Sequence, residues 1–141
     1  MSEISGTRCP AETVAAFLTE MNGWESLRAV TLDARRRGEI SWDEAEQRGK
    51  DGIRAFWDDF VSKSVDGTMR WTTFQTPPEY DPAKQTIVAT REISPSVAEV
   101  ETHDTRRDYR FIYVLVKEAG VWKIQRKFRV DEYDYRDKEP I

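Results

Sequence analysis

The sequence contains one cysteine and one histidine among its 141 residues. A single cysteine, Cys9, excludes a disulfide bond within the chain. Zinc sites commonly use several histidine and cysteine ligands, and Cys9 and His103 are far apart in the sequence. No G-x-S-x-G arrangement surrounds a serine. We therefore predict no metal, no cofactor and no catalytic residue.

Long apolar runs and an excess of positive charge are also missing. No apolar run approaches the roughly 20 residues that a membrane-spanning helix requires. The first residues do not resemble a secretory signal, so the expected location is the cytoplasm. The net charge of −4 weighs against a nucleic-acid-binding protein held by phosphate contacts. A basic protein is the better electrostatic partner.

Packing material is abundant, with 38% hydrophobic and 11% aromatic residues. This is too much for a disordered chain, although 34% of the residues are charged. The length fits one domain over residues 1–141. Residues 1–9 and 134–141 are expected to be flexible tails.

A long amphipathic helix is predicted near the start of the chain. Pro10 suits a first helical turn, and apolar residues recur after it at helical spacing. They are Val14, Phe17, Leu18, Met21, Trp24, Leu27 and Val30. We expect one long or kinked helix that passes through Gly23 and extends to about Arg36.

A second helix is predicted from Ser41, where "SWDE" matches a capping box. Its apolar face comprises Ala45, Ile53, Phe56, Trp57 and Phe60. Gly49 and Gly52 should weaken its first half, because glycine is a poor helix former.

From Thr68 onward the apolar pattern alternates, as in β-strands. Turn signals at 77–82, 94–95, 104–106 and 118–120 divide this region into five successive strands. Their short connections favour an antiparallel meander. Helices followed by strands are typical of the α+β class. The polar end, "DEYDYRDKEPI", is expected to be a strand tail that fades into disorder.

The segment 109–116 has apolar side chains on both faces of its predicted strand. Tyr109, Phe111 and Tyr113 alternate with Ile112, Val114 and Val116. One face should pack against the helices, whereas no third helix is left for the other. An aromatic patch there would indicate a partner protein or a second copy of the chain in a homodimer. The alternative is that sheet curvature or a returning loop covers it.

Two arginines interrupt apolar strand faces. Arg91 interrupts Ile87, Ala89 and Ile93, and Arg126 interrupts Trp122, Ile124, Phe128 and Val130. Glu99 and Glu101 share a face of the intervening strand and would supply inward ion pairs. Alternatively the arginines line an open pocket for an anionic group. A further alternative is proton transfer, with Glu101 or Glu99 as base and Tyr113 as donor.

The stretch "QTPPEYDP" at residues 75–82 connects two predicted strands. Its two prolines lack amide hydrogens and fix φ, so the stretch does not lie inside a sheet. This connection carries Glu79, Tyr80 and Asp81. It forms either a plain turn with Tyr80 packed back on the sheet, or a presented recognition surface.

Three motifs carry a resemblance to a known family. They are "FLTEMNGWE" at 17–25, "PPEYDP" at 77–82 and "YRFIYVLVKEAGVWKIQRK" at 109–127. Together they resemble the immunity proteins with the nuclear transport factor 2 fold that are found beside bacterial polymorphic toxins. The resemblance runs over most of the chain. It departs at Gln125, where the family pattern has an acidic residue.

The resemblance implies a cone-shaped fold and a protein that binds a cognate toxin and blocks it without catalysing a reaction. The rigid loop would then present Glu79, Tyr80 and Asp81 to a basic partner. The alternative is a small-molecule-binding protein, or an isomerase or lyase, with the same cone fold. That function would require a deep cavity with a convergent acid and donor.

Overall fold

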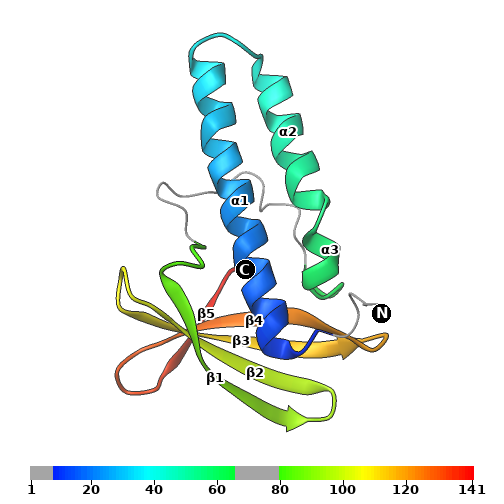
Figure 1. The fold of residues 1–141 in the computed structure, drawn as a ribbon, viewed down its shortest axis with the longest axis vertical. Coiled ribbons are helices and arrows are strands. Elements are labelled where there is room, and N and C mark those ends of the chain that lie inside the picture. Colours follow the sequence, from blue (N-terminus) through cyan, green and yellow to red (C-terminus); the bar gives the residue numbers. More distant parts are fainter. Residues whose placement is uncertain (1–7, 66–79) are drawn as a thin grey trace.

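A computed structural model of the protein describes residues 8–65 and 80–141. Three helices are followed by a sheet in this part of the chain (Figure 1). The helices are α1 (Pro10–Arg36), α2 (Trp42–Arg54) and α3 (Trp57–Phe60). The strands are β1 (Gln85–Ser94), β2 (Val97–Asp104), β3 (Tyr109–Glu118), β4 (Val121–Val130) and β5 (Arg136–Glu139). The α+β class is confirmed.

The long helix α1 begins and ends where the sequence predicts. The Glu12 carboxylate accepts a hydrogen bond from the Cys9 amide (2.9 Å) and caps its start. The first and second halves of α1 bury different faces of the helix, however. Leu27 and Val30 were predicted on the apolar face, yet they are exposed, while Arg28 and Thr31 are buried. The prediction was wrong here because the second half of α1 packs against α2 through polar groups.

Helices α1 and α2 form an antiparallel hairpin that extends away from the sheet (Figure 1). Ser41 caps α2 by accepting the Glu44 amide (3.1 Å). The Trp24 indole donates to the Gly49 carbonyl (2.8 Å), which requires close helix contact. A methyl group at Gly49 would lie 3.0 Å from the Arg28 guanidinium. Gly49 therefore serves helix packing, a role that helix propensity alone does not reveal.

The five strands form one antiparallel sheet in the order β1-β2-β3-β4-β5. It differs from the predicted meander at its carboxyl-terminal end. The strand predicted after Thr68 lies outside the described residues. The polar end contains β5, which pairs with β4 from Arg136 to Glu139, where we expected a flexible tail. Backbone pairing along an existing edge explains how so polar a segment becomes a strand.

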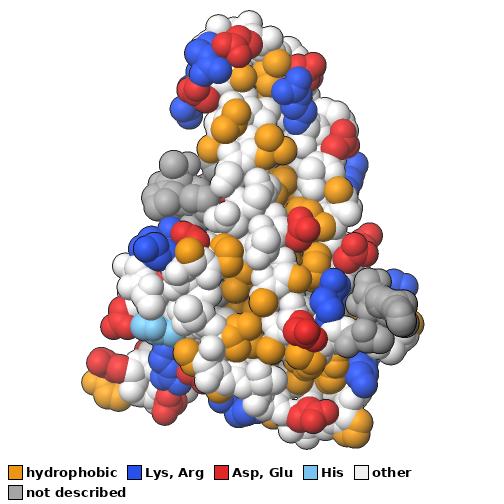
Figure 2. Space-filling model, viewed as in Figure 1, with side chains coloured by type: hydrophobic (Ala, Val, Ile, Leu, Met, Phe, Trp, Pro, Cys, Tyr) orange, Lys and Arg blue, Asp and Glu red, His pale blue; other side chains and the backbone are white. Residues whose placement is uncertain are grey.

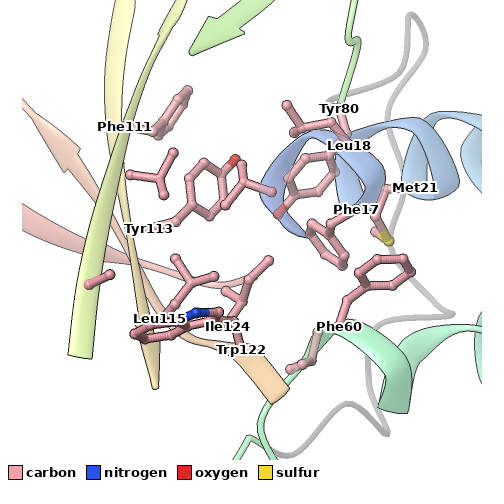
Figure 3. Packing of buried hydrophobic residues seen from close by; sticks show 14 of the residues in the cluster. Phe17, Leu18, Met21, Phe60, Tyr80, Phe111, Tyr113, Leu115, Trp122 and Ile124 are labelled. Atoms are coloured by element: carbon pink, nitrogen blue, oxygen red, sulfur yellow. The ribbon is translucent and has the colours of Figure 1, made fainter. Parts of the chain in front are cut away.

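The core lies between the first half of α1 and the sheet (Figure 3). Phe17 of α1 packs edge-on against Tyr80, with ring centroids 5.5 Å apart. From the sheet, Phe111, Tyr113 and Leu115 of β3 point toward the helix, together with Trp122 and Ile124 of β4. These buried side chains fill the space between α1 and the sheet.

A β-bulge at Gln125 changes the facing of β4. Leu115 pairs with Ile124, whereas the preceding Val114 pairs with Arg126, so Gln125 is an extra residue. Trp122 and Ile124 therefore face the core, and Phe128 and Val130 face the opposite side of the sheet. We predicted one shared face for all four residues, which is wrong because strand alternation is interrupted at this bulge.

Candidate functional site

Tyr80 is an internal anchor of the fold. Its side chain has no exposed surface, and two polar side chains of α1 hold its backbone. The Glu25 carboxylate accepts from the Tyr80 amide (3.0 Å), and the Asn22 side chain donates to the Tyr80 carbonyl (2.9 Å). The expectation that Tyr80 contacts a partner is therefore corrected. The alternative, Tyr80 packed back into the fold, describes its position.

Of the two residues beside Tyr80, only Asp81 belongs to the described part of the chain. Glu79 lies outside the described residues. Asp81 is partly exposed and forms a turn, in which its carboxylate accepts the Ala83 amide (2.9 Å) and its carbonyl accepts the Gln85 amide (2.8 Å). Asp81 thus begins β1 by turn chemistry.

The aromatic row of β3 packs on the side of the sheet that the helices cover. Phe111 and Tyr113 are 2% and 0% exposed, and Tyr109 is partly buried against the same core. Phe111 and Tyr113 therefore cannot form an aromatic docking face, whereas Tyr109 also lines a cleft at the edge of the sheet. The homodimer through the sheet stays a prediction. Alternation on β3 was predicted correctly, but sequence could not tell which face the helices cover.

The opposite sheet face carries a network of ion pairs. Arg91 contacts Glu99 (3.5 Å) and Glu101 (3.2 Å), as the ion-pair interpretation expected. Arg126 is exposed and belongs to none of the ion pairs between described residues. Arg110 contacts Glu101 (3.0 Å), and Arg136 contacts Glu99 (2.8 Å).

This network shows that the sheet is strongly bent. Arg136 lies on β5 and Glu99 on β2, with two strands between them in the sheet order. The hydrogen bond from Arg136 lowers the pKa of the Glu99 carboxyl, against the opposing effect of burial. Curvature and paired charges therefore cover this face, on which Ile112 is only 3% exposed.

The residues expected for proton transfer lie on opposite sides of the sheet. Glu99 and Glu101 belong to the ion-paired face, whereas Tyr113 points into the core. The Tyr113 hydroxyl donates to the Gln85 side chain (2.7 Å), which also accepts from Thr102 (2.9 Å). The proposed carboxylate base and tyrosine donor are thus not brought together.

A buried lysine is an unexpected feature of the core. Lys127 is 1% exposed, and its ammonium lies 4.6 Å from the ring centres of both Tyr80 and Phe111. Its Nζ is 3.3 Å from the Tyr80 hydroxyl. Aromatic faces stabilise a cation that burial has removed from water. The bulge at Gln125 places Lys127, and not Arg126, on the core face, which no sequence pattern indicated.

Among the described residues, the most exposed aromatic side chains lie between β4 and β5. We call residues 131–135, with the sequence Asp-Glu-Tyr-Asp-Tyr, the acidic tyrosine turn. Tyr133 is 83% exposed and Tyr135 is 65% exposed. In Figure 2, hydrophobic and acidic side chains adjoin at the lower left, where Figure 1 shows this connection. Three carboxylates and two tyrosines are thus presented together.

Hydrogen bonds fix the backbone of the acidic tyrosine turn. The Asp131 carboxylate accepts from the amides of Tyr133 and Tyr135, both at 2.9 Å. Asp134 adopts a positive φ of 64°, and its carboxylate contacts Arg110 of β3 at 3.0 Å. That hydrogen bond, followed by the one to Glu101, raises the pKa of Arg110. The turn is therefore tied to the sheet and not only to its own residues.

A cleft of about 590 Å³ adjoins this turn. It is lined by Asp131 and Glu132 of the turn, by His103 of β2 and by Asp108 of the β2–β3 connection. His103 Nε2 is 2.7 Å from the Asp108 carboxylate. Sequence reasoning missed this site because it treated the polar end as a tail. The Glu-Tyr-Asp triplet at 132–134 gave no signal of exposure, because the same triplet at 79–81 contains the buried Tyr80.

The described residues contain no group of three or more His, Cys, Asp or Glu side chains that could hold a metal ion. None of the helices in the described part of the chain is long and apolar enough to cross a membrane.

Comparison with protein families matches residues 9–139 to the NTF2 fold immunity proteins. The chain belongs to this family. Membership supports an immunity role and implies a cognate toxin as partner. No curated protein and no solved structure matched this immunity protein.

Proposed function

We propose that this immunity protein binds a cognate toxin in the cytoplasm and neutralises it by protein–protein contact, without catalysing a reaction. Family membership supports the immunity role. The filled space between α1 and the sheet favours surface recognition over small-molecule binding, because buried side chains occupy the place of a central ligand.

The acidic tyrosine turn is the proposed contact surface. The observation that carries this proposal is the high exposure of Tyr133 and Tyr135 on a hydrogen-bonded turn. Tyrosine is enriched among the residues that dominate binding energy at protein interfaces. A turn whose backbone is already fixed loses little conformational entropy when a partner binds. The adjoining cleft would receive a side chain of the toxin.

The proposed toxin surface is basic. Asp131, Glu132 and Asp134 surround the two tyrosines, and the whole chain carries a net charge of −4. Charge complementarity raises association rates and excludes partners of like charge. Arginine or lysine residues of the toxin would pair with Glu132, while its apolar surface would cover the tyrosine rings.

Binding to the toxin encoded beside this protein tests the proposal. We expect the double variant Tyr133→Ala/Tyr135→Ala to weaken binding by about 100-fold or more in calorimetry, because truncation of two central tyrosines removes hot-spot contacts. The same variant should fail to rescue growth when the toxin is co-expressed.

Trp42→Ala is the matched control, because Trp42 is a 53% exposed aromatic residue far along the chain from this turn. It should change affinity by less than about threefold. Wild-type affinity in the double variant would refute the turn as the contact surface. Failure of the wild-type protein to bind or protect would refute the function itself.

A further inference from the structure

A second surface lies between the helices, on the side where the described chain begins. A groove of about 520 Å³ has an apolar floor formed by Trp24 and Leu27 of α1, by Phe56 at the start of α3 and by Phe60 of α3. Leu27 is 54% exposed, so part of this floor is open to solvent. We call it the α1–α3 groove. Figure 1 shows α3 and the acidic tyrosine turn at different sides of the molecule.

Two carboxylates stand at the rim of the α1–α3 groove. Glu20 and Asp59 both line it and are both exposed. Neither side chain forms a hydrogen bond or ion pair with another described residue. An aromatic floor beside uncommitted carboxylates suits a guanidinium group, which stacks on a ring face while its N–H groups donate outward.

The chain's own Arg8 shows that a guanidinium fits in this groove. The Arg8 guanidinium carbon lies 4.5 Å from the centre of the Phe60 ring. Its Nε is buried, however, and meets no hydrogen-bond acceptor among the described residues. A buried donor without an acceptor costs free energy, so Arg8 occupies the groove in an unfavourable way. Such an occupant is displaceable.

We infer that the α1–α3 groove is a binding site for an arginine side chain, and that Arg8 occupies it until an arginine of a partner protein takes its place. The partner is the proposed toxin, so this part rests on the proposed function. A toxin arginine that approaches from solvent would stack on Phe60 and reach Glu20 and Asp59, which Arg8 does not contact as ion pairs.

The groove can be tested without the toxin. N-acetyl-arginine amide is titrated into the Arg8→Ala variant, and the amide of Gly23 and the indole N–H of Trp24 are followed by ¹⁵N NMR. We expect saturable shifts, with affinity at least threefold higher than in the wild-type protein, because the resident side chain is gone. N-acetyl-citrulline amide, which lacks the charge, should give no saturable shift.

Variants at the rim identify the carboxylates that bind. In the Arg8→Ala background, Glu20→Gln/Asp59→Asn should weaken arginine-amide binding by at least fivefold, whereas Asp43→Asn, an exposed carboxylate outside the groove, should not. Absence of saturable shifts, equal binding of the citrulline amide, or no effect of the rim variant would each overturn the inference. A dispersed spectrum of each variant establishes that it is folded.

Toxin-binding measurements on groove variants distinguish this inference from the proposed function. Arg8→Ala should raise toxin affinity, and Leu27→Lys, which adds a positive charge at an exposed groove residue, should lower it. If the toxin binds through the acidic tyrosine turn but neither substitution changes its affinity, the toxin is not the partner of the groove. If no toxin binds while the arginine amide does, the groove stands and the proposed function fails.

Discussion

At the scale of single residues, the sequence context of a tyrosine decides little compared with its tertiary surroundings. Glu-Tyr-Asp occurs at residues 79–81 and again at 132–134. Tyr80 is fully buried, because α1 offers Asn22 and Glu25 to its backbone and Phe17 to its ring. Tyr133 lies in the connection between β4 and the edge strand β5 and is 83% exposed. Both environments depend on residues distant in sequence.

This contrast predicts opposite stability effects for two identical substitutions. Tyr80→Ala should lower the free energy of unfolding by about 3–5 kcal/mol, because it removes a buried aromatic ring and leaves a cavity. Tyr133→Ala should change it by less than about 0.5 kcal/mol, because the ring is in solvent. Urea unfolding followed by tryptophan fluorescence measures both values. Equal losses would mean that Tyr133 is packed in solution.

At the scale of elements, the sequence predicts where helices begin and end better than what they face. The bounds of α1 follow from local signals, Pro10 at its start and basic residues at its end. The exposure of Leu27 could not be predicted, because it depends on α2 covering Arg28 instead. The predicted facing of β4 was wrong beyond Gln125 for a similar reason. A bulge shifts the alternation of side chains, and the local sequence does not indicate it.

The glycines of the helical hairpin allow a test of this packing. A methyl group added at Gly23 would meet no atom within 4 Å, so Gly23→Ala should stabilise the protein by about 0.5–1 kcal/mol through helix propensity. At Gly52 a methyl group would lie 3.0 Å from Trp24 Cδ1, and the Trp24 indole is held by Gly49. Gly52→Ala should therefore leave the stability of the protein unchanged or lower it, because the clash with Trp24 offsets the gain in helix propensity. The unfolding temperatures of the two variants test this prediction. Equal stabilisation by both would contradict close packing at Gly52.

At the scale of the whole molecule, the fold class and the family were predictable, whereas the candidate site was not. Helical and alternating periods distinguish α from β segments locally, and three motifs indicated the family. The acidic tyrosine turn becomes a site only because β5 pairs with β4 and Arg110 holds Asp134. Ion pairs between strands also stabilise the sheet as a whole. Because some of their carboxylates have a lowered pKa in the fold, the stability of the protein depends on pH.

Two carboxylates are expected to dominate that pH dependence. Burial raises the pKa of Asp104, but the hydrogen bonds and charges of Arg107 and Arg106 together outweigh it, so the pKa is lowered overall. Arg136 lowers the pKa of Glu99. A carboxyl group with a lower pKa in the folded state stabilises the protein above its unfolded pKa of about 4. That contribution is lost as pH falls through the folded value, so stability should decline below about pH 5.

Asp104→Asn and Glu99→Gln should each be less stable than the wild-type protein at pH 7. For Asp104→Asn the expected loss is about 1.5–3 kcal/mol, because Asp104 is buried and the substitution removes its charge-assisted hydrogen bonds to Arg107. Each difference should shrink as pH falls from 5 to 3, because the wild-type carboxyl then becomes protonated as well. Glu92→Gln, at an exposed carboxylate of β1, is the control and should follow the wild-type curve. Urea unfolding at pH 7, 5, 4 and 3 measures these differences. A gap that stays constant over this range would show that Asp104 and Glu99 stabilise the sheet by shape and not by charge, since only an ionised carboxylate couples folding to proton binding.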